Sequence, residues 1–239
     1  YPSNAAIADF QIKSQQVWGY TDFSIKTSNT EEYTANFLPT DIAVCESCIK
    51  EFNTLGNNRF QYPFISCTNC GPRYSIISNL PYDRETNSMS EFKMCPQCIS
   101  EYRTPSNRRF HAQTNCCSDC GPVLKLLDAQ GNTVDSSDCV NLARKLIYKG
   151  KILAVKGIGG YHLCCNAKDS AAVQRLRKLK HRPHKPFAIM ARNIESIHKI
   201  CEVSKKEKEI LTGSKKPILL LLKKLPEYLP QDIAPNQKR

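Results

Sequence analysis

The first forty residues alternate apolar and polar side chains in two short stretches. Residues 8–12 and 20–25 both have this alternation, which predicts a strand because neighbouring side chains of a strand point to opposite faces. Two strands cannot enclose a core of their own, so we expect their partners to lie elsewhere. The polar residues 28–40 end in a Leu-Pro-Thr sequence and are interpreted as a linker.

The pattern changes after Pro122 to a mixture of apolar runs and amphipathic stretches. The runs predict strands at residues 123–127, 151–155, 161–165, 186–190 and 217–222, the last of them buried. The amphipathic stretches predict helices between Asp138 and Gly150, from about Asp169 to Lys180, from Ile194 to Cys201 and from Ser204 to Leu211. This order of elements is typical of an α/β or α+β domain.

Between these two parts lies a cysteine repeat with an offset of fifty residues. Each copy is a Cys-x₂-Cys pair, eighteen residues, and a second Cys-x₂-Cys pair followed by Gly-Pro. The cysteines are Cys45, Cys48, Cys67 and Cys70 in the first copy and Cys95, Cys98, Cys117 and Cys120 in the second. Charged positions that match between the copies include Glu51/Glu101 and Arg59/Arg109. An internal repeat of this kind indicates one structural unit used twice.

This spacing predicts two structural zinc ions. A tight turn between two cysteines directs both sulfurs to one point, and two such pairs form the tetrahedron that Zn²⁺ prefers at structural sites. A second pair that follows the first after 15 to 20 residues is a strong sequence signal for such a site. A closed Cys₄ set leaves no position for substrate, so we expect no catalysis there. The spacing leaves open whether each ion takes its ligands from one copy or from both.

The alternative for these cysteines is a disulfide framework. Such a framework is typical of short secreted chains, whereas this chain has 239 residues, no recognisable signal peptide and an odd number of cysteines, thirteen. The cysteines outside the ligand set are expected to be buried free thiols: Cys116, Cys139, Cys164, Cys165 and Cys201. Only the eighteen-residue gap of the first copy selects Cys117 rather than Cys116 as the ligand, and His111 is expected to be a bystander.

The formal net charge of +12 indicates attraction to anions such as nucleic acid, nucleotides or phosphorylated substrates. The longest apolar run, residues 217–222, is far shorter than the roughly 20 residues that cross a bilayer, so no membrane association is expected. Reduced cysteines without a targeting segment predict the cytoplasm as the location.

A glycine-rich turn follows the predicted strand at 151–155. Lys156 precedes it, and Gly159 and Gly160 could let backbone N–H groups approach an anion. A glycine-rich turn is also common as a simple connection between two strands, so the pattern by itself does not decide between anion binding and a structural turn. The neighbouring His162 is expected to be packed rather than catalytic.

Basic residues continue from Arg175 through Lys180, Arg182 and Lys185, beyond the predicted helix and across a loop that contains two prolines. A run of charge is usually a solvated face. A run that crosses a loop constrained by proline suits a fixed phosphate clamp better, because preorganised cations bind phosphate at a lower entropic cost. We therefore interpret these residues as a candidate phosphate site.

Several of these motifs together resemble a known family. The duplicated cysteine unit, with residues 80–84 (Leu-Pro-Tyr-Asp-Arg) and 108–113 (Arg-Arg-Phe-His-Ala-Gln), is similar to the zinc segment of the HypF carbamoyltransferases, which are [NiFe]-hydrogenase maturation factors. Residues 156–163 and 180–186 resemble that family's YrdC-like domain, which is akin to the threonylcarbamoyl-adenylate synthases. The resemblance extends from about Thr40 to the end of the chain.

The resemblance implies a division of labour in a longer enzyme. An acylphosphatase domain would cleave carbamoyl phosphate, the YrdC-like domain would use ATP with Mg²⁺ to form carbamoyl adenylate, and a Kae1-like domain would pass the carbamoyl group to the C-terminal cysteine of HypE. The group would become a cyanide ligand of the hydrogenase. The resemblance assigns Lys180, Arg182 and Lys185 to the nucleotide phosphates, and Lys156, Gly159 and Gly160 to the same pocket.

The predicted fold class is a multidomain α+β chain in which tandem Cys₄ zinc-finger repeats precede an incomplete YrdC-like α/β domain. We expect an internal fragment, because the acylphosphatase loop and the Kae1-like domain have no counterpart in these residues. The expected parts are the last acylphosphatase-like strands at 1–27, a linker at 28–40, finger 1 at 41–78, finger 2 with its connecting loop at 79–122, and the YrdC-like part at 123–239.

Two other functions fit some of these features. The net charge and the paired fingers suit a nucleic-acid-binding module, for example one that binds tRNA. However, few aromatic residues are interleaved with the basic residues of the fingers for base stacking. The second alternative is a zinc-stapled scaffold without activity of its own.

Overall fold

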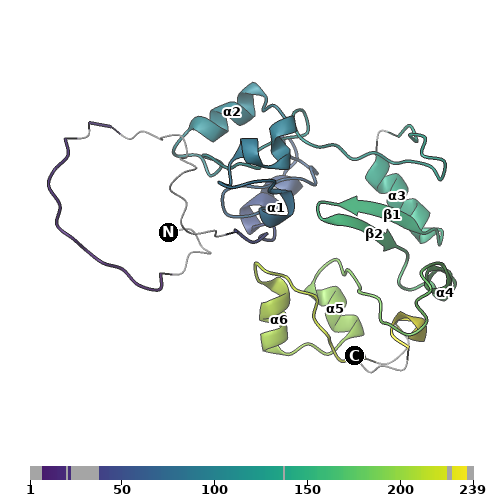
Figure 1. The fold of residues 1–239 in the computed structure, drawn as a ribbon. Coiled ribbons are helices and arrows are strands. Elements are labelled where there is room, and N and C mark those ends of the chain that lie inside the picture. Colours follow the sequence, from purple (N-terminus) through teal and green to yellow (C-terminus); the bar gives the residue numbers. More distant parts are fainter. Residues whose placement is uncertain (1–6, 20, 23–37, 137, 225–227, 236–239) are drawn as a thin grey trace. The chain divides into compact units, whose positions relative to one another are not determined.

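The computed structural model describes residues 7–19, 21–22, 38–136, 138–224 and 228–235 (Figure 1). The chain divides into two compact units, residues 1–121 and 122–239, called unit 1 and unit 2 below. Each unit is considered by itself.

Residues 7–19 contain no regular secondary structure, so the strand predicted at 8–12 is wrong. The side chains of Phe10 and Ile12 are 76% and 88% exposed, which shows that no second layer covers this alternating stretch. Most of the second predicted strand, at 20–25, lies outside the described residues.

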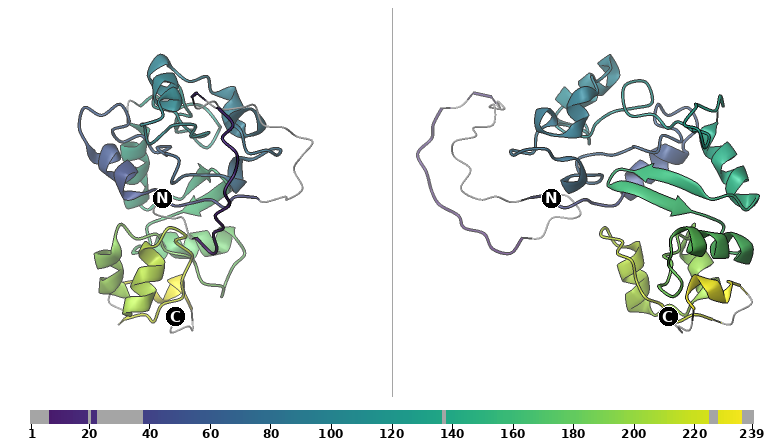
Figure 2. Two further views of the ribbon diagram at one scale, coloured as in Figure 1. Left: turned by 90° about the vertical axis from the view of Figure 1, so that its left-hand side faces the viewer. Right: turned by 45° about the vertical axis from the view of Figure 1, so that its right-hand side comes forward.

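Unit 1 contains one helix per cysteine repeat, and the two helices occupy equivalent positions (Figure 2). Helix α1 spans Glu46–Asn53 and α2 spans Pro96–Arg103. Each begins directly after the first cysteine of its repeat, Cys45 or Cys95, whose extended backbone marks the N-terminus. Short 3₁₀ segments at Tyr74–Ile76, Arg84–Thr86 and Ser88–Glu91 connect the two repeats.

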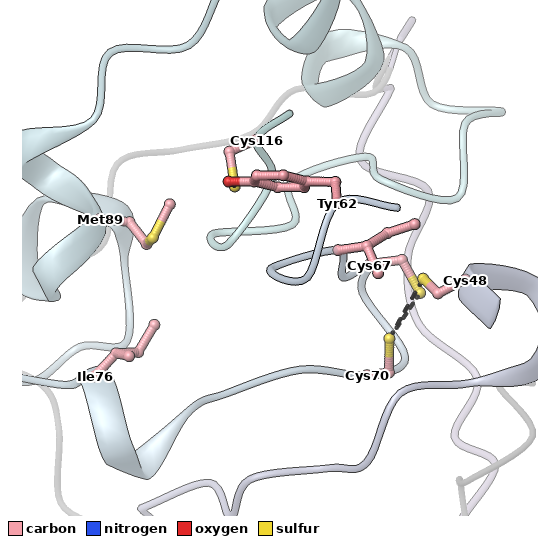
Figure 3. Close-up of a cluster of buried hydrophobic side chains, with 8 residues drawn as sticks. Cys48, Tyr62, Cys67, Cys70, Ile76, Met89 and Cys116 are labelled. Carbon is pink, nitrogen blue, oxygen red and sulfur yellow. Dashed lines mark hydrogen bonds between the residues drawn. The ribbon is translucent and has the colours of Figure 1, made fainter. Parts of the chain in front are cut away.

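The core of unit 1 is small and rich in sulfur. Its buried members are Cys48, Tyr62, Ile65, Cys67, Cys70, Ile76, Met89 and Cys116. Figure 3 shows the sulfurs of Cys48, Cys67 and Cys70 at one end of this cluster and the side chains of Ile76 and Met89 at the other. A core with so little apolar mass cannot by itself offset the conformational entropy of ordering the unit, so we expect it to need another source of stability.

The described residues of unit 2 form four helices, one β-hairpin and a 3₁₀ segment. Helix α3 (Cys139–Tyr148) leads into strands β1 (Leu153–Gly157) and β2 (Gly160–Cys164), which pair antiparallel with Lys156 opposite Tyr161. Helices α4 (Ser170–Leu179), α5 (Ile194–Ile200) and α6 (Lys205–Thr212) follow, and a 3₁₀ segment lies at Gln231–Ile233 (Figure 1).

The four helices of unit 2 agree with the sequence patterns because their ends carry local signals. Asp138, Asp169, Asn193 and Ser204 each accept a hydrogen bond from a backbone N–H of the first helical turn. Ser204 and Glu207 also form a capping box, in which each side chain bonds to the backbone N–H of the other residue. Gly150 follows α3 at φ 75°, a conformation that favours glycine.

Three predicted strands of unit 2 are absent from the described residues. Residues 123–127 make only an isolated bridge between Leu127 and Thr133, and residues 186–190 and 217–222 are not strands either. The run at 217–222 is not buried, since Leu220 is 68% exposed. Each run makes only isolated backbone hydrogen bonds, such as the one from the N–H of Glu202 to the carbonyl of Leu222, and a strand exists only when another backbone satisfies successive hydrogen bonds.

None of the helices in the described ranges is both long enough and apolar enough to cross a membrane.

Candidate functional site

The first cysteine repeat brings its four sulfurs to one point. The Sγ–Sγ distance is 3.8 Å from Cys45 to Cys67, 3.8 Å from Cys67 to Cys70, and 3.5 Å from Cys70 to Cys48. Figure 3 shows Cys48, Cys67 and Cys70 of this set. The four sulfurs lie within 4.8 Å of one another, and three of the four residues are buried. All four come from the same repeat.

The second repeat makes the same arrangement with its own cysteines. The Sγ–Sγ distance is 3.8 Å from Cys95 to Cys117, 3.8 Å from Cys117 to Cys120, and 3.7 Å from Cys120 to Cys98. The ligand sets therefore stay within their repeats, which answers the question that the sequence left open.

These distances fit a tetrahedral zinc ion. With Zn–S bonds of about 2.3 Å, the edge of a regular tetrahedron of sulfurs is about 3.8 Å. The observed separations of 3.5 to 3.8 Å match that edge, whereas a disulfide would need about 2.05 Å. All eight cysteines are free thiols. The two clusters thus have the donor set and the spacing of two structural zinc sites.

Cys116 and His111 stay outside the second cluster. Cys116 is buried, its sulfur lies 3.5 Å from the hydroxyl of Tyr62, and burial raises the pKa of its thiol. His111 packs against the ring of Tyr102, with the ring centroids 4.7 Å apart. Of the other cysteines outside the ligand sets, Cys139, Cys164, Cys165 and Cys201 are only partly buried, so the expectation of buried thiols is wrong for them. They belong to unit 2, where one hairpin leaves few layers to cover them.

The two repeats exchange buried ion pairs. Arg59 of the first repeat, whose side chain is 1% exposed, reaches the carboxylate of Glu101 in the second at 2.5 Å. Arg109 of the second repeat reaches Glu51 in the first. The same arginines donate through Nε to backbone carbonyls of the opposite repeat, those of Cys116 and Ser66. Because these pairs occupy equivalent positions, the two fingers of this one chain contact each other reciprocally, as the subunits of a two-fold dimer do.

Arginines of one repeat also approach the sulfurs of the other. Arg108 places Nη2 3.1 Å from Sγ of Cys48, and Arg59 places Nη2 3.4 Å from Sγ of Cys98. A Zn(Cys)₄ centre carries a charge of about −2 if all four thiols ionise, so these guanidinium groups lie where they would offset it. The sequence pairs Arg59 with Arg109 between the copies but indicates no role for either. Arg108 has no charged counterpart, because Asn58 stands at the equivalent position of the first copy.

The titration of the buried acid follows from these contacts. Burial alone would raise the pKa of Glu51, but hydrogen bonds from Arg108 and Arg109 lower it below its usual range. Within the first cluster, hydrogen bonds from Cys48 and then Cys70 lower the pKa of Cys67, and the contact with Cys67 raises the pKa of Cys48. Sulfurs this close cannot ionise independently without a cation between them.

The residues predicted for an anion site lie on two elements of unit 2. Lys156 is on β1 with an exposed side chain, and Gly159 and Gly160 form the turn of the hairpin, the latter at φ 146°. Lys180 and Lys185 are exposed in the loop that follows α4. Within the described parts of unit 2, no hydrogen bond or ion pair joins the hairpin turn to this loop.

Arg182 of this loop uses its guanidinium on the loop itself. Its Nη2 donates to the carbonyl of Pro186 at 2.7 Å, and the group stacks over the ring of Phe187 at 5.4 Å. An open hollow of about 450 Å³ is lined by Lys149, Gly150, Lys151, Ile152, Asp169 and Arg175. Of these residues, only Arg175 belongs to the basic run predicted as a phosphate site.

Comparisons with known proteins agree with this architecture. The family model described as HypF finger matches residues 44–77 and 94–127. The model for the Sua5/YciO/YrdC family, described as Telomere recombination, matches residues 145–239.

Carbamoyltransferase HypF of Synechocystis is 46% identical over all 239 residues, and HypF2 of Cupriavidus necator is 47% identical over 84% of the chain. The chain spans 31% and 25% of the lengths of these relatives.

Two solved structures are similar over 84% of the chain. The crystal structure of HypF from T. kodakarensis matches with a TM-score of 0.81 at 47% identity, and the chain covers 27% of it. A full-length HypF in a phosphate- and nucleotide-bound form matches with a TM-score of 0.78 at 44% identity, and the chain covers 26% of it. Through its two Cys₄ fingers and its YrdC-like part, this chain belongs to the family of HypF carbamoyltransferases.

Proposed function

We propose that this chain is the zinc-bearing and nucleotide-binding part of an ATP-dependent carbamoyltransferase that matures [NiFe] hydrogenases in the cytoplasm. The proposal is carried by the match over the whole chain to the carbamoyltransferase HypF of Synechocystis, and it is supported by the match over 84% of the chain to a HypF structure described as phosphate- and nucleotide-bound. The substrates would be carbamoyl phosphate and ATP with Mg²⁺. The final acceptor would be the C-terminal cysteine of HypE.

The two cysteine clusters would each hold one structural zinc ion. Cys45, Cys48, Cys67 and Cys70 would hold the first, and Cys95, Cys98, Cys117 and Cys120 the second. Zinc supplies folding free energy at such sites, because the unfolded chain has no preformed site. The chain's own contribution is the exchange of arginines that balances the charge of the thiolates.

The nucleotide would bind to the basic part of unit 2. Lys180, Arg182 and Lys185 would contact its phosphates, and Lys156 with Gly159 and Gly160 would line the same pocket. In the adenylation step, a carbamate oxygen bonds to the α-phosphorus of ATP and the bond to pyrophosphate breaks. Both reactants are anions, so preorganised cations lower the barrier by balancing their charge as they approach.

Calorimetric titration of the zinc-loaded chain with Mg-ATP tests this proposal. We expect saturable binding that Lys180→Ala combined with Arg182→Ala abolishes, while Arg144→Ala on α3 has no effect. Unchanged binding in the double variant would refute the phosphate assignment. Binding to tRNA that weakens with salt, without binding to ATP, would favour the nucleic-acid function instead.

A further inference from the structure

One member of the basic run points inward rather than to solvent. Arg177 lies in the last turn of α4 and is 7% exposed, whereas Lys178 and Lys180 beside it are exposed. The sequence placed it in the basic run that is interpreted as a candidate phosphate site. Its burial calls for a structural explanation, because a buried guanidinium must have its donors satisfied.

The guanidinium of Arg177 donates to backbone carbonyls in two separate segments. In the loop after α4, Nη1 reaches the carbonyl oxygens of Arg182, Pro183 and Lys185 at 2.7, 3.3 and 3.1 Å. In the 3₁₀ segment near the end of the chain, Nε and Nη2 reach those of Asp232 and Ile233 at 2.5 and 3.0 Å. One side chain therefore binds the backbones of both segments.

The backbone of Arg177 holds the same loop from the other side. The N–H of Arg182 donates to the carbonyl of Arg177 at 3.0 Å, and the N–H of His181 donates to that of Lys178 at 3.1 Å. His181 has φ 48°, so α4 ends in a Schellman motif with histidine in the left-handed position. The backbone N–H and the backbone carbonyl of Arg182 are thus both hydrogen-bonded to Arg177.

Phe187 completes the junction. Its ring lies 4.4 Å from the guanidinium carbon of Arg177 and 5.4 Å from that of Arg182. Its backbone N–H donates to the carbonyl of Ile233 at 3.0 Å, which joins the end of the loop to the 3₁₀ segment. Ile233 is itself buried. The loop and the segment therefore share one set of contacts.

Positive charge predominates at this junction. Residues 177–187 contain no Asp or Glu, and no ion pair to Arg177 occurs in the described part of unit 2. The carboxylate of Asp232 receives hydrogen bonds from Ser170 and Gln174 and attracts Arg177 only beyond contact distance. Carbonyl dipoles and the ring of Phe187 make the direct contacts with the buried cation, so its field adds to that of the exposed Lys180 and Lys185 and favours an anion at the loop.

We propose that Arg177 is the positioning residue of this loop. It holds residues 180–187 in the shape that presents Lys180 and Lys185 to the phosphates of a nucleotide, and it ties that shape to the docking of residues 231–234. Nucleotide binding and the order of the 231–234 segment are then coupled. The inference rests on the proposed nucleotide-binding function.

The test compares Arg177→Lys with Arg144→Lys, an exposed arginine on α3 whose contact is to Asn141. A lysine keeps the charge but cannot span five carbonyls with one ammonium group. Hydrogen exchange of the ligand-free, zinc-loaded chain reports the order of residues 180–187 and 231–234. Calorimetry reports the affinities for Mg-ATP and for adenosine, which lacks phosphates.

We expect Arg177→Lys to speed exchange in both segments together. We also expect the Kd for Mg-ATP to rise about tenfold, since the apparent Kd rises as the competent fraction falls. The Kd for adenosine should not change, and Arg144→Lys should match the wild type throughout. Phe187→Leu, which removes the stacked ring and keeps apolar volume, should give the same paired response and serves if Arg177→Lys does not fold.

Two results would overturn the inference. One is unchanged hydrogen exchange at residues 180–187 in both Arg177→Lys and Phe187→Leu. The other is an equal loss of affinity for Mg-ATP and for adenosine in these variants, which indicates general unfolding. A wild-type chain that binds no Mg-ATP would instead overturn the proposed function, and the exchange measurement would still decide whether Arg177 fixes the loop.

Discussion

Neutralising Glu101 should weaken both fingers, although Glu101 belongs to the second. Glu101 receives Nη1 and Nη2 of the buried Arg59, at 2.9 and 2.5 Å, from the first repeat. The variant Glu101→Gln keeps the shape of the side chain and removes its charge. Arg59 is then a buried cation whose remaining partners are neutral carbonyl and amide oxygens and the sulfur of Cys98.

The magnitude follows from the burial of the pair. The side chains of Arg59 and Glu101 are 1% and 16% exposed, so solvent screens their interaction little. Breaking a buried pair by removing one partner costs roughly 3–5 kcal/mol. We expect the lower end, about 3 kcal/mol, because the amide still accepts one hydrogen bond. This loss of free energy corresponds to about a hundredfold increase in the fraction of molecules whose fingers are locally unfolded, and zinc is released from these molecules.

The assay is the release of zinc to a chromophoric chelator, with native mass spectrometry to count the ions that remain. The exposed Glu91→Gln, in the segment between the repeats, is the matched control. In Glu101→Gln both ions should leave about a hundredfold faster and together, without a one-zinc species. Release of one ion at the faster rate while the other keeps the wild-type rate would refute the coupling of the repeats.

Three further predictions concern the ligands, the acid response and the packing of unit 1. Cys117→Ser should bind one zinc fewer by elemental analysis, whereas Cys116→Ser should keep both. The folded-state pKa of Glu51 lies below its unfolded value, so its contribution to stability is full above about pH 4.3 and is lost as the pH falls further. In Glu51→Gln the free energy of unfolding, measured by chemical denaturation, should therefore fall less steeply as the pH is lowered below this value. Gly121→Ala would place a Cβ 2.2 Å from the Tyr62 hydroxyl and should lower the free energy of unfolding by about 1–3 kcal/mol. In Gly157→Ala the new Cβ meets only ordinary contacts at 3.6 Å, so the free energy of unfolding should fall by less. Thermal unfolding of the two variants measures this difference.

Local sequence predicted those features whose causes are local. The cysteine pairs specify a metal site because two residues between ligands fix one half of the tetrahedron, and a second pair supplies the other half. Capping residues such as Asp138 and Ser204 mark helix ends because they bond to N–H groups only a few positions away.

Features that depend on distant partners could not be found this way. The apolar run at 217–222 has strand composition, but strand pairing requires a neighbour that the run itself cannot specify. Arg59 matched Arg109 across the repeat, yet its acceptor Glu101 lies 42 positions along the chain. The sequence grouped Arg177 with the predicted phosphate site and could not show that it is buried, because its carbonyl partners at 232 and 233 carry no sequence signal.

The two repeats have matching residues at their buried charged positions and differ at a more exposed one. Arg59 and Arg109, 1% and 3% exposed, retain equivalent acids, because either arginine buried without its partner would cost several kcal/mol. At the preceding position the copies differ. Arg108, 29% exposed, adds a second guanidinium beside the first sulfur cluster, whereas the equivalent Asn58 leaves its buried Nδ2 without a hydrogen-bond partner in the described part of unit 1.

This difference makes the two clusters unequal. The first is flanked by Arg108, which contacts the sulfurs of both Cys45 and Cys48, and the second by Arg59, which contacts the sulfur of Cys98 alone. More positive charge beside thiolates stabilises their ionised, metal-binding form. The two cysteine clusters of the duplicated unit therefore differ in their guanidinium contacts, and the cluster with fewer such contacts lies in the second repeat.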